Sequence, residues 1–223
     1  MAEHKIKWSH SSLKAYETCP RRYHEETVLK NFPRVETESM RYGTEVHAAL
    51  EGYVNGTPIP DMYSQFKPVV DALLAKPGRR FPEMEMAVTA ELHPCDWKSP
   101  QAWARGISDL TLIDDDALKA IIVDFKTGNN KYPDRDQLVL MSLLTFAHFP
   151  HIMKINSALL FIVKGTMVKM QMRREQADQF WWKYRERVAC IEASYANNVW
   201  NPKQSGLCKA WCPILSCEFN GKH

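Results

Sequence analysis

The residues of this chain best suited to chemistry are two aspartates and a lysine near its middle. Asp124 and Lys126 lie two positions apart in residues 121–128 (IIVDFKTG), and Asp109 ends residues 105–109 (RGISD). If both segments are strands of one hairpin, a two-residue period places Asp124 and Lys126 on one face and brings Asp109 beside Asp124. Paired carboxylates are costly to bury unless they bind a cation, and a hard cation such as Mg²⁺ prefers oxygen ligands. The Lys126 ammonium could then orient a water or stabilise charge on a phosphate.

Three further residues could complete such a site. His47 lies on an expected helix one turn after Gly43, Glu85 lies on the polar face of an expected strand, and Gln137 opens the helix that follows the hairpin. Two of these signals have simpler interpretations when taken alone. An isolated Asp-x-Lys, such as Asp124 and Lys126, is more often a surface ion pair, and an isolated histidine such as His47 is more often a packing residue. The set as a whole therefore carries the hypothesis of a metal site.

The elements that position these residues follow from hydrophobic period and turn residues. A serine hydroxyl within residues 9–12 (SHSS) is expected to cap a helix, and Pro20 should kink or end that helix just after Cys19. Further helices are expected over residues 40–55, 62–76, 134–148 and 174–197, and strands over 83–92, 103–113, 118–126, 157–163 and 167–172. The pattern predicts one α/β domain with a helical N-terminal flank and a loop-like tail from residue 199.

Composition sets outer limits on the class of protein. Of 223 residues, 45% are hydrophobic and 25% charged, which excludes a disordered or fibrous chain. The apolar runs are too short to span a bilayer, and residues 1–5 do not resemble a secretory signal, so we expect a cytoplasmic protein without a membrane partner. With 29 basic and 26 acidic residues the net charge is +3, which permits nucleic-acid binding without requiring it.

The cysteines form a second pattern. Cys208, Cys212 and Cys217 lie close together near the C-terminus, and Cys19 lies some 190 residues earlier. Disulfides are rare in the cytosol, and tightly spaced cysteines there usually bind metal. Four thiolates suit either tetrahedral Zn²⁺ or an iron–sulfur cluster. Either group would join the first helix to the tail.

The ordered motifs resemble the RecB-type branch of the PD-(D/E)XK nuclease superfamily. The resemblance covers residues 8–217 and rests on residues 9–23 (SHSSLKAYETCPRRY), 42–51 (YGTEVHAALE), Gly-x-x-Asp at 106–109, Asp-x-Lys-Thr-Gly at 124–128 and Gln-Leu at 137–138. It implies a restriction-endonuclease-like mixed central sheet flanked by helices, and hydrolysis of DNA phosphodiesters with Mg²⁺ or Mn²⁺. Stand-alone enzymes of this type resemble those of bacteriophages and CRISPR adaptation systems, with DNA ends as substrate and a recombination or CRISPR-adaptation protein as partner.

The resemblance also assigns roles. The metal ligands would be His47, Asp109, Asp124 and the Phe125 carbonyl, with Glu85 as a further candidate, and the catalytic residues would be Asp109, Asp124, Lys126 and Gln137. The branch often has a tyrosine four residues after the glutamine, where this chain has Met141. Exonuclease action is expected because no segment resembles a base-reading module. The alternative is a nucleic-acid-binding or assembly factor that has lost catalysis.

For the cysteines, the resemblance favours a [4Fe–4S] cluster over zinc. The late cysteines of iron–sulfur members are usually spaced x2 then x5, whereas here they are x3 then x4. We therefore expect a single domain over residues 1–223 whose tail, 199–223, is held to Cys19 by a metal centre. Candidates for phosphate contacts are Arg21, Arg22, Lys131 and Arg135. Trp181, Trp182 and Trp211 could stack on bases, although core packing is the expectation for Trp181 and Trp182. Cys190 is expected in the core.

Overall fold

A computed structural model describes residues 6–33, 35–129 and 131–221. By internal packing the chain divides into two compact units, residues 36–181 and residues 1–35 with 182–223, and each is described by itself. The expectation of one domain stays a prediction. Residues 1–5, on which the expectation about a secretory signal rests, lie outside the described residues, as do the last two residues of the tail.

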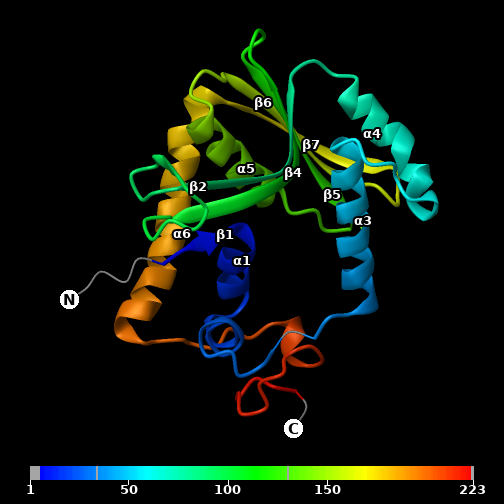
Figure 1. Ribbon diagram of the computed structural model, residues 1–223. Helices are drawn as coiled ribbons and strands as arrows, with labels where there is room; N and C mark the ends of the chain where they lie inside the picture. The colour runs from blue at the N-terminus through cyan, green and yellow to red at the C-terminus, as the bar shows by residue number, and fades with distance from the viewer. Residues whose placement is uncertain (1–5, 34, 130, 222–223) are drawn as a thin grey trace. The chain divides into compact units, whose positions relative to one another are not determined.

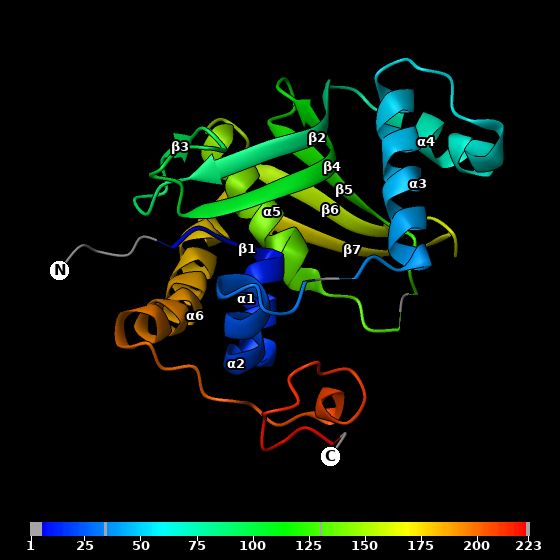
Figure 2. The ribbon, with the colours of Figure 1, turned by 60° about the horizontal axis from the view of Figure 1, so that its bottom comes forward.

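The larger unit is built on a mixed sheet (Figures 1 and 2). Its strands lie in the order β3-β2-β4-β5-β6-β7. Their bounds are β2 (Arg79–Val88), β3 (Pro94–Cys95), β4 (Ala104–Asp114), β5 (Lys119–Lys126), β6 (Lys154–Phe161) and β7 (Thr166–Arg173). Only β5 and β6 pair in parallel among these neighbours. The expected mixed sheet flanked by helices, typical of the restriction-endonuclease-like fold, is confirmed.

The hairpin expected around Asp109 and Asp124 is present. β4 and β5 pair antiparallel, with Leu110 opposite Val123 and Ile113 opposite Ala120. β5 is the central strand, with Ala120, Ile122 and Val123 buried, and it pairs in parallel with β6. A parallel neighbour requires a crossover connection, which helix α5 (Arg135–His148) supplies.

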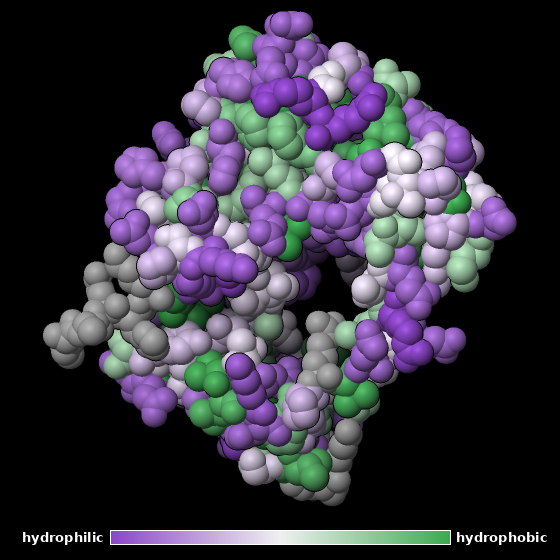
Figure 3. Space-filling model, viewed as in Figure 1, coloured by the Kyte–Doolittle hydropathy of each residue, from purple (hydrophilic) through white to green (hydrophobic). Residues whose placement is uncertain are grey.

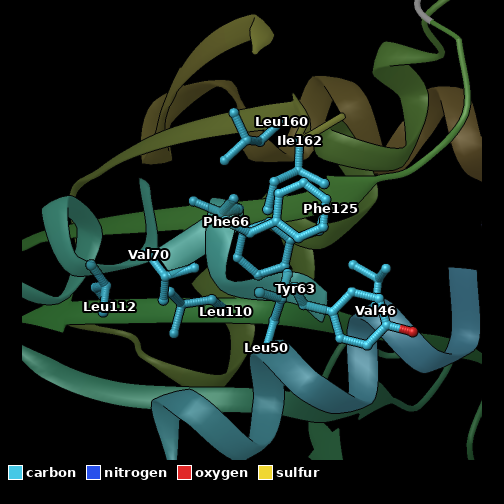
Figure 4. Packing of buried hydrophobic residues seen from close by; sticks show 11 residues of the cluster. Val46, Leu50, Tyr63, Phe66, Val70, Leu110, Leu112, Phe125, Leu160 and Ile162 are labelled. Carbon is cyan, nitrogen blue, oxygen red and sulfur yellow. The ribbon is translucent and has the colours of Figure 1, made fainter. Parts of the chain in front are cut away.

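Helices cover both faces of this sheet (Figures 1 and 2). On one face lies α5, which is buried from Leu138 to Phe146. On the other face lie α3 (Glu38–Val54), the 3₁₀ turn η2 (Asp61–Phe66) and α4 (Lys67–Leu74). Figure 4 shows the core on this second face, where Val46 and Leu50 of α3 meet Phe66, Leu110 and Phe125. The two faces therefore hold α3 and α5, the helices that carry His47 and Gln137, against the same hairpin.

Beside α4 the second face of the sheet stays open as a groove of about 730 Å³. Val69 and Leu73 of α4 line it together with Ile121, Leu160 and Met167 of the sheet. Figure 3 shows apolar surface in the upper part of the view, where Figure 1 places the strands of the sheet and α4. None of the candidate site residues lines this groove.

The second unit contains the two ends of the chain. Its elements are β1 (Trp8–Ser9), α1 (His10–Thr18), α2 (Pro20–Tyr23), the π-helical turn η1 (His24–Val28), most of α6 (Ala177–Asn197) and the 3₁₀ turn η4 (Gly206–Cys208); a further 3₁₀ turn, η3 (Arg174–Gln176), precedes α6 in the larger unit. The expected serine cap of α1 is Ser9, which accepts from the Ser12 N–H, and α1 ends at Thr18, one residue earlier than predicted, with Cys19 as its C-cap. Pro20 then begins α2.

The first and last helices of this unit pack together through specific contacts. The Tyr16 hydroxyl donates to the Cys190 carbonyl at 2.8 Å. The rings of Trp8 and Tyr184 stack with centroids 5.3 Å apart, and Arg187 forms two hydrogen bonds with Glu17. The N- and C-terminal segments thus share one core.

Two expectations for α6 were wrong. Trp181 is buried as expected, but Trp182 is 61% exposed, and Cys190 is exposed rather than in the core. The buried stripe of α6 runs through Trp181, Tyr184, Val188 and Ile191 at helical spacing. Trp182 and Cys190 each lie one residue beside that stripe, so the helix turns them away from it. Within the described residues, no helix is long and apolar enough to cross a membrane.

Candidate functional site

Asp124, Lys126 and Gln137 form one network at the end of β5. Asp124 is 2% exposed and lies 2.6 Å from Lys126 Nζ through its Oδ2 atom. The Gln137 amide lies between them: its Nε2 donates to Asp124 Oδ1 and its Oε1 accepts from Lys126 Nζ at 2.9 Å. The two-residue period of the strand turns Asp124 and Lys126 towards α5, while Phe125 packs in the core on the α3 side. The predicted shared face is present.

Asp109 and His47 lie next to this network. The Phe125 N–H donates to Asp109 Oδ2 at 2.5 Å, so the Asp109 carboxylate is held against the peptide that follows Asp124. Its other oxygen lies 3.3 Å from Nδ1 of His47. Gly43, one turn earlier on α3, lets the helix approach β5: a Cβ there would lie 3.2 Å from Thr127 Oγ1. That the Phe125 carbonyl is a metal ligand stays a prediction.

Glu83, which sequence reasoning missed, completes the cluster. Ligand atoms of His47, Glu83 and Asp109 all lie within 4.8 Å of one another. Glu85, the acidic residue expected from the sequence, lies two positions further along β2 and is exposed, outside this group. The carboxylate in this position therefore comes from Glu83.

Glu83 joins the cluster in place of Glu85 because the alternation of side chains along the paired strands β2 and β4 is interrupted. In the β2–β4 register Glu83 stands opposite Asp109, between the paired Pro82–Leu110 and Met84–Ser108. Residues 106 and 110 of a regularly alternating strand would face the same side of the sheet. Gly106 faces α5, since a Cβ there would lie 2.9 Å from Leu144 Cδ1, whereas Leu110 packs on the opposite face. Glu83 has a φ of 42°, in the left-handed region that non-glycine residues seldom adopt. Such strained residues gather at functional sites, and a strict alternation cannot reveal one.

Burial and mutual repulsion raise the pKa values of two carboxyl groups in the cluster. Burial, with the charge of Asp109 as the second cause, raises the pKa of Glu83 to about 7. Burial and the neighbouring Asp109 charge also hold the pKa of Asp124 above its usual value, against the opposing effect of Lys126. The hydrogen bond to Asp109 raises the pKa of His47, although burial acts against it. Three carboxylates thus share a partly buried space with one ammonium and one imidazole.

These residues fit a divalent cation. Asp124 Oδ2 is buried and, apart from its ion pair with Lys126, accepts no hydrogen bond from any described residue. Carboxylate oxygens with an imidazole are ligands that Mg²⁺ and Mn²⁺ accept, and a cation would relieve the repulsion that raises the acid pKa values.

The sequence matches a known protein family over most of its length. The family model described as "PD-(D/E)XK nuclease superfamily" matches residues 7–217. The chain belongs to the PD-(D/E)XK nuclease superfamily. PD-(D/E)XK nucleases generally use divalent metals, so His47, Glu83 and Asp109 form a candidate metal group, and the substrate class is nucleic acid. No curated protein matches the chain.

Two solved structures are similar to this chain. A crystal structure described as "Putative exonuclease" from Eubacterium rectale is 10% identical with a TM-score of 0.53, covering 92% of this chain and 86% of that one. A second, called SSO0001, is 14% identical with a TM-score of 0.41, covering 78% and 69%. At 10% identity the first shows a shared fold alone.

Met141, at the position where the RecB-type branch often has tyrosine, has a packing role in this PD-(D/E)XK chain. It is 3% exposed, and its Cε and Sδ atoms occupy the space that a side chain at Gly106 would need. The residue therefore seals α5 against β4 and faces away from solvent.

The four cysteines of the tail pattern line one small cavity in the terminal unit, of about 20 Å³. Cys19 Sγ accepts from the Lys203 N–H at 3.4 Å and Cys208 Sγ from the Ser205 N–H at 3.4 Å. Cys212 and Cys217 are buried around Ile214. All four are free thiols, and within the described part of the chain no three of their sulfurs lie within 4.8 Å of one another.

The candidate phosphate-contacting residues are divided between the units. Arg22 pairs with Glu26 at 2.8 Å, and Arg21 donates to the Ser216 carbonyl at 3.2 Å. Lys131 and Arg135, which flank the start of α5, are both exposed. The structure thus gives Arg21 and Arg22 partners within their own unit, whereas Lys131 precedes the helix that carries Gln137 and Arg135 is its first residue.

Proposed function

We propose that the protein is a metal-dependent deoxyribonuclease of the RecB-type branch that removes nucleotides from DNA ends. One observation carries the proposal: the Asp124–Lys126–Gln137 network lies directly beside the His47–Glu83–Asp109 cluster at one end of the hairpin. The pairing of Asp109 with the Phe125 N–H joins the two groups.

Different side chains would bind the metal ion and stabilise the phosphate. Glu83, Asp109 and Asp124, with the His47 imidazole, would hold Mg²⁺ or Mn²⁺, which supplies a more acidic water and offsets charge on the phosphate. Asp124 and Gln137 hold the Lys126 ammonium in place through contacts at 2.6 and 2.9 Å. A fixed ammonium stabilises the negative charge that builds on a phosphate during displacement, and needs no reorganisation to do so. Gln137 serves as the positioning residue, because its amide bonds to both charged groups.

The choice of substrate rests on the family resemblance and on what the chain lacks. No described segment resembles a base-reading module, which favours ends over specific sequences. We therefore propose DNA as the nucleic acid and exonuclease action as the mode. The exposed Lys131 and Arg135, and to a lesser extent Arg21 and Arg22, would contact phosphates. A cytoplasmic location and a recombination or CRISPR-adaptation partner are proposed on the same resemblance.

End-labelled single- and double-stranded DNA, incubated with Mg²⁺, Mn²⁺ or EDTA, tests the proposal. The expected result is degradation of linear DNA with either metal, no degradation in EDTA, and no cleavage of a circular single strand. Cleavage of the circle would contradict the exonuclease assignment. DNA binding without cleavage of any substrate would establish the alternative, a catalytically silent nucleic-acid-binding factor.

We also propose that Cys19, Cys208, Cys212 and Cys217 bind one structural metal centre, a [4Fe–4S] cluster in preference to zinc. Their position around one cavity and the N–H groups directed at Cys19 and Cys208 support a shared centre. A zinc ion with bonds of about 2.3 Å would hold its sulfurs about 3.8 Å apart. Among the described residues no three of these sulfurs lie within 4.8 Å of one another, so a larger group joins them with less movement than zinc.

A further inference from the structure

The connection between β5 and α5 begins and ends at the candidate active site. Lys126 is the last residue of β5, and Gln137 lies in the first turn of α5. Their side chains hydrogen-bond at 2.9 Å, so the chain leaves the site after Lys126 and returns to it at Gln137. Any side chain on this connection is therefore confined to the neighbourhood of the site.

Tyr132 lies on this connection and is 82% exposed. Single exposed aromatic residues are ordinary on protein surfaces. Tyr132 differs from such a residue in two ways. It lies on the connection that begins and ends at the candidate site, and the Lys131 ammonium lies 5.3 Å from the centre of its ring. Lys131 is itself exposed and has no ion pair with any described residue. The pair presents an aromatic face and a positive charge together.

The reach of the chain limits how far Tyr132 can lie from the site. It is six residues from Lys126 and five from Gln137. An extended residue spans at most about 3.5 Å, so the Tyr132 backbone lies within about 20 Å of both anchors whatever path the connection takes. Stacked nucleotides rise about 3.4 Å each, so a strand of roughly six nucleotides from the reacting phosphate covers that distance.

We propose that Tyr132, with Lys131, forms a binding subsite for single-stranded nucleic acid beside the active site. The Tyr132 ring stacks on one unpaired base and the Lys131 ammonium faces the phosphate backbone. A base inside a duplex has both faces covered by its neighbours, so the ring can engage only an unpaired or frayed strand. This inference rests on the proposed nuclease function and deepens it by naming the form of the substrate, a strand end that is single-stranded where it leaves the active site.

Fluorescence anisotropy in EDTA, where no metal-dependent cleavage occurs, measures DNA binding without turnover. The probes are a labelled 12-nucleotide single strand and a blunt-ended DNA hairpin closed by a non-nucleotide linker, so that it has no unpaired base, and the variants are Tyr132→Ala and Tyr132→Phe. Stacking on an aromatic residue is worth about 1–3 kcal/mol per base, so Tyr132→Ala should weaken single-strand binding by roughly five- to 150-fold. Tyr132→Phe should bind like the wild type, and hairpin binding should change less than about twofold. Trp182→Ala, which removes an exposed aromatic ring that does not lie on this connection, is the matched control and should bind like the wild type.

A series of single strands with one abasic nucleotide locates the contact. One position should weaken binding to the wild type and have no effect on Tyr132→Ala. In Mg²⁺, Tyr132→Ala should raise KM for the single strand and leave kcat unchanged, because the ring does not touch the reacting atoms. Unchanged single-strand affinity in Tyr132→Ala, equal losses on the hairpin, or a Phe variant as weak as the Ala variant would each overturn the subsite. A wild type that binds the strand but never cleaves it contradicts the proposed function instead, so the two failures are distinguishable.

Discussion

The surroundings of Glu83 in the site change the pKa of its carboxyl group. Burial and Asp109 raise its pKa to about 7, so part of the metal-free protein carries a neutral Glu83 at neutral pH. A metal ligand must be deprotonated, and binding therefore releases protons. We predict that Mn²⁺ affinity weakens as pH falls from about 8 to 6, with proton release visible as a buffer-dependent enthalpy in calorimetry.

The variant Glu83→Gln should bind Mn²⁺ more weakly at pH 8 and show a flatter pH dependence. Glu85→Gln is the matched control, because Glu85 is exposed and lies outside the cluster. An equal loss in both variants would mean that general negative charge, rather than the position of Glu83, attracts the cation.

His47 offers a second test at this scale. Its ring is about one third exposed and contacts Asp109 at 3.3 Å, so removing it leaves little buried space unfilled. We predict that His47→Ala weakens Mn²⁺ binding while the melting temperature of the metal-free protein changes little. Calorimetric titration beside thermal melts measures both. A lower melting temperature with unchanged metal affinity would identify His47 as a packing residue.

The residues also show where sequence reasoning succeeds. Asp109, Asp124 and Lys126 could be placed together because a two-residue period and a hairpin are local properties, and Gln137 was added by the family resemblance. Glu83 could not, because the positive φ at Glu83 interrupts the alternation on which the prediction for Glu85 depended. A non-glycine residue in that conformation leaves no mark in a single sequence.

At the scale of elements, the contact between β4 and α5 positions the site. Gly106 leaves room for Met141, and a Cβ there would overlap Met141 Cε and lie 2.9 Å from Leu144 Cδ1. We predict that Gly106→Ala lowers the free energy of unfolding by about 1–3 kcal/mol, the usual cost of overpacking a core. Chemical denaturation measures this change. Gly128→Ala is the control, because a Cβ there meets nothing within 4 Å.

A double-variant cycle assigns the cost to the contact. In a Met141→Ala background, Gly106→Ala should cost less than in the wild type, since the overlapping side chain is gone. Equal costs in both backgrounds would place the strain elsewhere.

The elements themselves were largely predictable from hydrophobic period and caps. The expected helix over residues 62–76 instead divides into η2 and α4, with Pro68 at the start of α4.

For the whole molecule, the cysteine-lined cavity gives a prediction about assembly. Protein purified without oxygen should be brown, absorb near 400 nm and contain about four irons per chain if the cysteines hold a [4Fe–4S] cluster. Cys217→Ser should lose that metal and melt at a lower temperature, while Cys190→Ser, an exposed cysteine outside the cavity, should do neither. A colourless protein with one zinc would contradict the cluster but keep the shared centre. Full alkylation of all four thiols in the folded protein would exclude any such centre.

At this scale the sequence predicted the sheet and the enclosing helices, and its single domain over residues 1–223 stays a prediction, but it did not show which segments of the two chain ends pack together. Residues 1–35 and 182–223 pack as one unit because contacts such as Tyr16 with Ser194 join segments almost 180 residues apart. Hydrophobic period reports which side of a helix is buried and not which distant segment covers it. The four cysteines were the one signal that linked these ends.

The central claim is that Asp124 holds the cation while Lys126 acts on the phosphate. The rate of cleavage of an end-labelled single strand, measured against Mn²⁺ concentration, tests both roles in one titration. Lys126→Met should keep the wild-type half-saturating concentration and lose about 100-fold or more in the plateau rate. Asp124→Asn should require far more Mn²⁺ to show any cleavage. A wild-type plateau in Lys126→Met, or a wild-type half-saturating concentration in Asp124→Asn, would contradict the account.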